Sequence, residues 1–203
     1  MIQIKGNDDI GHTYIISRFD QVFIIDPASE YLKILELIKN KTLSGIILTH
    51  AHSDHINLIG YFDCPIYIHE RDYDLLFLNK YNGYNDKKAP FDKNKLKIIK
   101  ISKEKEFLSI ADKKVTLLHT PGHTKGSISI IYDKHIFTGD LLFENDIGRY
   151  DLYSGNYLDL KHSILKILND KENNNLIICP GHDNLSTVKK EKKYNQFYLK
   201  FKK

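Results

Sequence analysis

The sequence predicts an α+β protein in which two β-sheets pack together and helices cover their outer faces. The 203 residues contain two successive blocks of short strand-like segments, and helix-like segments close each block. A sheet and a helix each bury one apolar face, and the chain is long enough for a sizeable core. Two such blocks therefore favour two packed sheets with helices outside.

The first block combines strands with short helices. Apolar runs bounded by turn residues predict strands over residues 2–5, 12–19, 22–26, 45–49 and 65–69. A helix is expected over residues 29–40, with Leu32, Leu35 and Ile38 facing inward because they recur every three positions. Two further helices are expected over residues 54–60 and 70–79.

A long polar loop at residues 79–95 separates the blocks and carries Tyr81, Tyr84 and Phe91. Long loops in compact domains tend to be lids or mobile segments, so this loop either covers a substrate or is an insertion without a role.

The second block is richer in strands. Strands are predicted over residues 96–101, 106–110, 114–119, 127–132, 135–138 and 176–179. Helices are predicted over residues 156–169 and 186–199. No low-complexity linker divides the chain, so we expect one domain over residues 1–203.

The composition is that of an ordinary globular chain, with 41% hydrophobic and 28% charged residues. A net charge of +4 gives no reason to expect a nucleic-acid partner. Cys64 and Cys179 are too few for a disulfide framework. Neither a secretory signal pattern nor an apolar run of about eighteen residues is present, so we expect a cytoplasmic protein without a membrane partner.

The most informative stretch is residues 49–57, T-H-A-H-S-D-H-I-N, which directly follows an apolar strand. It places His50, His52, Asp54 and His55 within six residues. Imidazole and carboxylate together suit zinc, iron or manganese, and the absence of cysteine argues against a closed structural zinc site. A solvated loop that binds nothing is the alternative, but three histidines and an aspartate favour a metal centre.

Three later strand ends supply further donors in a similar way. His123 follows a strand and a Pro-Gly turn, and His182 repeats the same order of strand, Pro-Gly and His. Asp140 follows an apolar strand and a glycine. Repetition of this arrangement indicates that these side chains join the first cluster.

These motifs make the chain resemble the metallo-β-lactamase superfamily, and within it the small glyoxalase II-like hydrolases. The motifs are H-A-H-S-D-H, T-P-G-H-T-K-G-S at residues 120–127, F-T-G-D-L-L-F at 137–143, I-G-R-Y-D-L at 147–152 and P-G-H at 180–182. The resemblance runs from about residue 10 to residue 199. It implies a four-layer αβ/βα sandwich with two divalent metal ions between the edges of the sheets, and no C-terminal helical glyoxalase II domain.

The resemblance also implies the role of each donor. The matching positions are His50, His52 and His123 for a first metal, Asp54, His55 and His182 for a second, and Asp140 as the bridge between them. Zinc is the default, and iron or manganese also fit such donors. Asp54 is in addition the candidate catalytic residue, since a carboxylate beside the attacking hydroxide can orient it or take its proton.

Asp26, which ends the strand V-F-I-I-D, matches an acidic position that supports a metal-bound histidine in relatives. It also suits the turn before the helix at residue 29, and the two roles are compatible. His12, His69, His119, His135 and His162 are interpreted as packing or surface residues, and Cys179 as a small buried strand residue.

The implied activity is hydrolysis of a small-molecule thioester such as S-D-lactoylglutathione, by attack of a metal-bridging hydroxide on the carbonyl. Without the helical domain of full-length glyoxalase II, Arg149 and Tyr150, with Tyr153 nearby, are the candidates to contact a carboxylate-bearing substrate. The pattern G-R-x-D-L has Asp151 where the longer enzymes have tyrosine, which leaves the thiol carrier open.

Three other functions are alternatives to thioester hydrolysis. A persulfide dioxygenase of related fold would use one iron held by two His and one Asp. A ribonuclease of the superfamily would need an RNA-gripping appendage, for which the chain has little room. A metal-binding sensor would hold metal without turnover. The sequence leaves the oligomeric state open.

Overall fold

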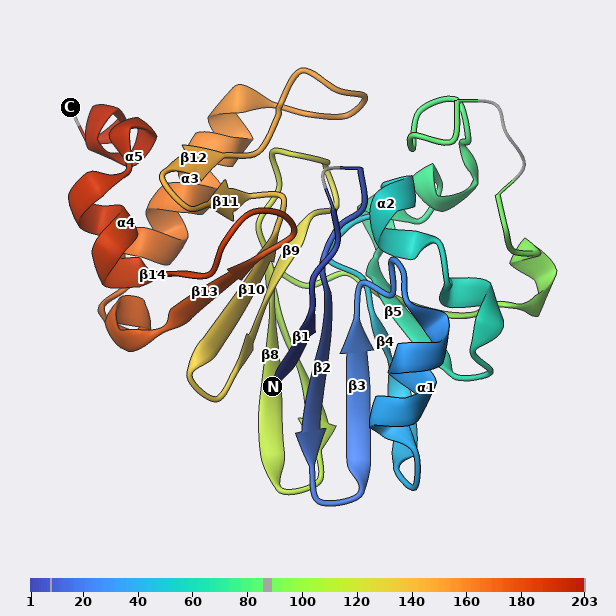
Figure 1. The fold of residues 1–203 in the computed structure, drawn as a ribbon. Coiled ribbons are helices and arrows are strands. Elements are labelled where there is room, and N and C mark those ends of the chain that lie inside the picture. Colours follow the sequence, from blue (N-terminus) through green and yellow to red (C-terminus); the bar gives the residue numbers. More distant parts are fainter. Residues whose placement is uncertain (8, 86–88, 203) are drawn as a thin grey trace.

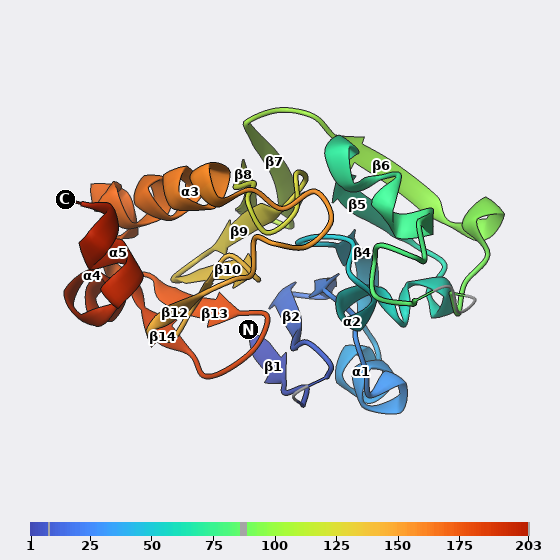
Figure 2. The same cartoon turned by 90° about the horizontal axis from the view of Figure 1, so that it is seen from above.

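The computed structural model describes residues 1–7, 9–85 and 89–202, and it has two six-stranded sheets between two layers of helices (Figure 1). This arrangement confirms the predicted four-layer αβ/βα sandwich. Viewed from above, two helices, α1 (Tyr31–Ile38) and α2 (Ser53–Ile56), lie outside one sheet (Figure 2). Three helices lie outside the other sheet: α3 (Tyr157–Asn169), α4 (Val188–Tyr194) and α5 (Gln196–Phe201).

The first sheet has the order β1-β2-β3-β4-β5-β6, and its strands are Ile2–Ile4, Thr13–Arg18, Gln21–Ile25, Thr42–Ile47, Pro65–His69 and Lys97–Ile101. β1, β2 and β3 are antiparallel, whereas β3, β4, β5 and β6 run parallel to one another. The helices on its outer side are α1, Tyr31–Ile38, and α2, Ser53–Ile56.

The second sheet has the order β14-β13-β10-β9-β8-β7, and its strands are Ser186–Thr187, Ile177–Pro180, His135–Gly139, Ile128–Tyr132, Lys113–His119 and Lys105–Ile110. β10 and β13 are parallel, and the other pairs are antiparallel. Its outer helices are α3, Tyr157–Asn169, α4, Val188–Tyr194, and α5, Gln196–Phe201. A small hairpin, Leu142–Phe143 (β11) with Asp146–Ile147 (β12), follows β10.

Both faces of the central strands are buried, which explains their continuous apolar runs. In β3, Phe23 and Ile25 pack between the sheets, whereas Ile24 packs on the helix side of the first sheet. In β10, Phe137 packs between the sheets and Ile136 packs toward α3. Alternation of side chains along each strand therefore divides the core into three layers.

The inward face of α1 differs from the prediction. Leu32 is 78% exposed and Leu35 is 38% exposed, whereas Ile34 is fully buried and Leu37 and Ile38 pack beside it. Residues at i, i+3 and i+4 share one side of a helix, and a strict spacing of three drifts off that side. The prediction was therefore wrong for Leu32 and Leu35.

Three predicted helices are shorter than expected. Residues 70–79 form two 3₁₀ turns, Glu70–Asp72 and Leu75–Phe77, and the helix predicted at 54–60 is α2 followed by a 3₁₀ turn at Ile59–Tyr61. The segment 186–199 begins as β14 and then forms two helices. They are separated at Asn195, whose side chain accepts hydrogen bonds from the backbone N–H groups of Phe197 and Tyr198 and so caps α5.

The remaining 3₁₀ turns are Lys93–Lys95 and Lys171–Asn175. Within the described ranges, no helix combines the length and apolar character needed to cross a membrane.

Candidate metal centre

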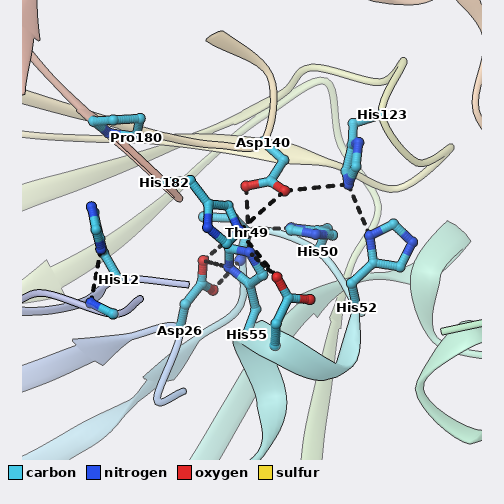
Figure 3. Close-up of polar contacts among 12 residues, drawn as sticks. His12, Asp26, Thr49, His50, His52, His55, His123, Asp140, Pro180 and His182 are labelled. Carbon is cyan, nitrogen blue, oxygen red and sulfur yellow. Dashed lines mark hydrogen bonds and ion pairs between the residues drawn. The ribbon is translucent and has the colours of Figure 1, made fainter. Parts of the chain in front are cut away.

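The predicted ligands lie where strands of both sheets end at one edge of the sandwich. β4 runs parallel to β3, and β13 runs parallel to β10, so the segments that follow these strands leave each sheet on the same side. Figure 3 shows the side chains of these segments turned toward a common point. The structure brings together all seven predicted donors: His50, His52, Asp54, His55, His123, Asp140 and His182.

His50, His52 and His123 form the first group of donors. Their ring centroids are 4.8, 4.7 and 4.7 Å apart, so the three imidazoles are nearly equidistant. Nδ1 of His52 is 2.8 Å from Nε2 of His123. One ligand atom from each residue can lie within 4.8 Å of the others, which suits a single metal ion.

Asp54, His55 and His182 form the second group, and Asp140 lies between the two. Oδ2 of Asp54 is 3.0 Å from Nε2 of His182 and 3.4 Å from Nε2 of His55. Oδ1 of Asp140 is 3.3 Å from Nε2 of His55, and its Oδ2 is 3.6 Å from Nε2 of His123 in the first group. The carboxylate of Asp140 therefore has one oxygen beside each group of donors, and its role as a bridging ligand stays a prediction.

The hydrogen bonds of the imidazoles fit a metal centre. The Nδ1 atoms of His50, His55 and His123 face Thr49 Oγ1, Asp26 Oδ2 and the carbonyl oxygen of Arg149, at 3.1, 2.9 and 2.7 Å. The opposite ring nitrogens then face the cluster. Nε2 of His50, His52 and His55 and Oδ1 of Asp140 are buried without a hydrogen-bond partner in the protein. Buried polar atoms normally have partners, and a cation would supply one for the atoms of His50, His55 and Asp140. His52 is different, because the ring nitrogen that faces His123 is Nδ1 and not Nε2.

Glycine allows the last donor to approach. A Cβ atom on Gly181 would lie 2.1 Å from Oδ1 of Asp140 and 2.7 Å from Cε1 of His55. A larger residue before His182 would therefore clash with the side chains of Asp140 and His55.

Burial and neighbouring charges set the protonation of the cluster. Burial lowers the pKa of His50 well below 6.5, and the other imidazoles lower it further. Burial also lowers the pKa of His52 to about 3. Burial would raise the pKa of Asp54 and Asp140, but the charge of His55 lowers the pKa of both carboxyls below the usual range. The low pKa values of His50 and His52 favour neutral imidazoles, and those of Asp54 and Asp140 favour ionised carboxylates, which are the forms that bind cations. Burial would lower the pKa of His55, but the neighbouring carboxylates instead raise it.

Asp26 contacts two residues of the stretch 49–57, Thr49 and His55. Its Oδ1 accepts the backbone N–H of Thr49 at 2.7 Å, and its Oδ2 accepts the Thr49 hydroxyl at 2.5 Å and faces Nδ1 of His55. Thr49 Oγ1 in turn faces Nδ1 of His50. Thr49 was not among the predicted site residues, yet its hydroxyl links Asp26 to a histidine of the first group.

An open cavity of about 560 Å³ leads to the cluster, and five of the donors line it: His52, Asp54, His123, Asp140 and His182. A larger cavity of about 810 Å³ lies beside residues 76–77 and 89–93, and no donor lines it. We therefore take the smaller cavity as the candidate substrate site.

Arg149 lines this cavity, whereas Tyr150 does not belong to its lining. Tyr150 packs instead against Tyr157, with ring centroids 5.1 Å apart. Tyr153 lines the cavity and stacks on Tyr81 of the polar loop, at 4.3 Å between centroids and 19° between ring planes. Arg149 is exposed and makes a two-pronged ion pair with Asp151.

The polar loop is held to the first sheet by two of its three aromatic residues. Tyr84 and Phe91 pack against the core beside α1 and α2, and the Tyr84 hydroxyl donates to Oδ1 of Asn57 at 2.9 Å. Residues 86–88 of the predicted lid lie outside the described residues. A covering role for the loop stays a prediction.

His12, His69, His119 and Cys179 have structural surroundings, whereas His162 is exposed. His12 is buried between the backbone N–H of Gly6 and the carbonyl oxygen of Asp183. The rings of His69 and His119 stack at 3.9 Å. Cys179 is fully buried in the core between the sheets.

Comparisons with known proteins agree with this geometry. The sequence profile of the Metallo-beta-lactamase superfamily matches residues 6–182. A Bacillus subtilis protein named probable metallo-hydrolase YqgX is 34% identical over 195 residues, which are 92% of this chain and 91% of that protein. The crystal structure of the BLEG-1 B3 metallo-β-lactamase has a TM-score of 0.85 and 29% identity, covering 97% of this chain and 98% of that one.

A di-iron-bound form of the protein TTHA1623 has a TM-score of 0.77 and 26% identity, covering 97% of this chain and 100% of that one. The fold, the cluster of His and Asp donors and the profile that spans most of the sequence agree with one another. The chain therefore belongs to the metallo-β-lactamase superfamily and has its fold, with a site for divalent metal ions.

Proposed function

We propose that this protein is a metal-dependent hydrolase of thioesters, acting on S-D-lactoylglutathione or a related acyl-thiol that carries an anionic group. One observation carries the proposal: seven nitrogen and oxygen donors, in two adjacent groups, converge at an open cavity of about 560 Å³. The name of the Bacillus subtilis relative supports hydrolysis. The donors suit two divalent ions, with zinc as the default and iron supported by the di-iron-bound relative.

Two bound cations would provide an activated water at neutral pH and polarise a substrate carbonyl. Asp54 is the residue of the cluster best placed to handle the proton of that water. Its carboxylate lines the cavity, its side chain is 25% exposed, and its Oδ2 lies 3.0 Å from Nε2 of His182. The low pKa of Asp54 keeps the carboxylate ionised, so it can orient the water through a hydrogen bond.

The remaining cavity wall supports an anionic substrate with an apolar part. Arg149 and Lys80 are the cations among the lining residues, and Tyr81, Tyr153, Phe143 and Leu152 supply aromatic and aliphatic surface. Tyr81 and Tyr153 both line the cavity, and their stacked rings join the polar loop to residues 150–155. A carboxylate of the acyl-thiol could meet Arg149, since an exposed ion pair with Asp151 is weak enough to be exchanged.

The test is a panel of thioesters assayed on the zinc-, iron- and manganese-loaded protein, with metal content measured in parallel. Wild type should hydrolyse at least one thioester, and Asp54→Ala should lose about 10²–10⁴-fold in kcat. Asp112→Ala is the matched control, because Asp112 is an exposed carboxylate paired with Arg18 away from the cavity. A fully metallated protein that hydrolyses no thioester would refute the proposal.

The same preparations separate the alternatives. A β-lactam included in the panel tests the activity named for BLEG-1. Oxygen consumption with a persulfide, at one iron per chain, would indicate a dioxygenase. Bound metal without turnover of any ester, thioester or lactone would indicate a sensor.

A further inference from the structure

Asp72 is a buried carboxylate whose role lies outside the seven donors. It ends the 3₁₀ turn after β5, and its side chain is fully buried. Three donors satisfy it. Oδ2 accepts the backbone N–H of Ala51 at 3.1 Å and the Thr124 hydroxyl at 2.7 Å, and Oδ1 accepts the backbone N–H of Gly126 at 2.8 Å.

The partners of Asp72 lie beside the first group of histidines. Ala51 is the residue between His50 and His52, and Thr124 directly follows His123. His50 and His52 follow a strand of the first sheet, whereas His123 follows a strand of the second. One carboxylate therefore ties together the two segments, from different sheets, that carry all three imidazoles.

The local sequence is fitted to this contact. A Cβ atom on Gly126 would lie 2.5 Å from the backbone nitrogen of Asp72 and 2.6 Å from its Oδ1, so only glycine lets the chain come this close. Because the Thr124 hydroxyl donates its proton to Asp72, the Ser127 hydroxyl at 2.8 Å must donate to Thr124. The Ser127 oxygen then accepts the N–H of Thr124 at 3.0 Å. The network has each donor matched to an acceptor.

We infer that Asp72 is a positioning residue for the first metal, holding the segments of His50, His52 and His123 at the spacing at which three imidazoles bind one ion. The inference rests on the proposed metal centre and not on the substrate. The three hydrogen bonds of Asp72 reach none of the second group, Asp54, His55 and His182. Loss of the carboxylate should therefore act on one metal and spare the other.

A second link limits the size of the effect. The backbone N–H of Ile128 donates to the carbonyl oxygen of Thr49 at 2.9 Å and joins the same two segments. Removing Asp72 should therefore loosen the first site without abolishing it. Supporting groups behind metal ligands typically change metal affinity by about 10–100-fold.

The test is titration of the chelator-stripped full-length protein with Zn²⁺ in competition with a chromophoric chelator. Wild type should bind two equivalents. Asp72→Asn should weaken one equivalent by about 10–100-fold and leave the other within about threefold. In a His52→Ala background, where the first site is already disabled, Asp72→Asn should have no further effect on the remaining equivalent.

Milder variants and a matched control keep the test decisive if Asp72→Asn fails to fold. Thr124→Val removes one of the three hydrogen bonds and should weaken the same equivalent, whereas Thr124→Ser retains the hydroxyl and should restore it. Glu191→Gln is the control, because Glu191 is also fully buried and also accepts three hydrogen bonds, from Asn145, Asn195 and Ser186. It should lower stability and keep both zinc affinities.

Three results would overturn the inference. In Asp72→Asn, both equivalents of zinc could be weakened equally. Thr124→Val could keep both wild-type affinities, or Glu191→Gln could show the same selective loss as Asp72→Asn. Wild type that binds no Zn²⁺ would overturn the metal centre itself. Wild type that binds two equivalents but hydrolyses no thioester would refute only the proposed function, because the zinc titration uses no substrate.

Discussion

Nδ1 of His55 lies 2.9 Å from Oδ2 of Asp26, and both side chains are almost completely buried. A proton on Nδ1 directed at this carboxylate leaves Nε2 to face Asp54 and Asp140. The contact therefore decides which ring nitrogen of His55 is available to a metal.

Asp26→Asn should lower the affinity of the second metal by about 10–100-fold, because the amide would direct a donor group at Nδ1 of His55 or at Thr49. Asparagine is the appropriate substitution because Asp26 has a φ of 49°, which asparagine tolerates better than most residues. Zinc titration and kcat measured at limiting metal check this. Asp26→Asn with wild-type zinc affinity would show that the contact does not orient His55.

Removal of metal should destabilise the fold. At free Zn²⁺ about 100-fold above its Kd, binding to the native state adds about 2.7 kcal/mol, which corresponds to a Tm higher by about 5–10 °C. Thermal unfolding of stripped and reloaded protein measures the difference. Mg²⁺ at the same concentration should give little change, since imidazole-rich sites favour softer cations. An equal rise with Mg²⁺ would contradict the assignment of the histidines.

Tyr153 and Arg149 should contribute to substrate binding more than Tyr150 does. Arg149 and Tyr153 line the cavity, and Tyr150 packs against Tyr157 outside its lining. Arg149→Ala and Tyr153→Ala should each raise KM by about 10-fold, which corresponds to the loss of about 1.4 kcal/mol of binding free energy. Tyr150→Phe should change KM little. Steady-state kinetics on an accepted thioester decide this. A larger KM effect in Tyr150→Phe would favour the sequence-based prediction for Tyr150.

His69 should make the protein sensitive to acid. Burial, and after it the stacked His119 and the nearby Arg71, together lower the pKa of His69 to about 4. The neutral form is therefore favoured in the native state, so its contribution to stability is complete above pH 6.5. This contribution is lost as the pH falls from 6.5 toward 4. At pH 4.5 the free energy of unfolding should be lower by about 2–3 kcal/mol.

His69→Asn removes this titration and keeps a side chain that can accept the N–H of Arg71, as Nδ1 of His69 does at 3.3 Å. Urea unfolding of both proteins at pH 7 and pH 4.5 measures the free energies. Between pH 7 and pH 4.5, the free energy of unfolding should fall by about 2–3 kcal/mol less in the variant than in wild type. Equal losses would mean that the titration of His69 is not coupled to folding.

The sequence was sufficient to predict the four layers and the cluster of donors for a local reason. The donors lie in the segments that come after strands, as His50 comes after β4 and Asp140 after β10, and parallel strands end at a common edge. Both the apolar runs and the polar residues after them are contiguous in the chain. Their places could therefore be inferred without knowledge of distant contacts.

The tertiary structure decided the features that depend on residues far apart in the sequence. Asp72 receives its role from Thr124 and Gly126, more than fifty positions away, as the separations of its hydrogen bonds show. Tyr153 lines the cavity because it stacks on Tyr81, and α1 buries Ile34 because of how it packs on the first sheet. Chain order determines which residues follow each strand, but only the packing of the two sheets determines which of these segments come within hydrogen-bonding distance.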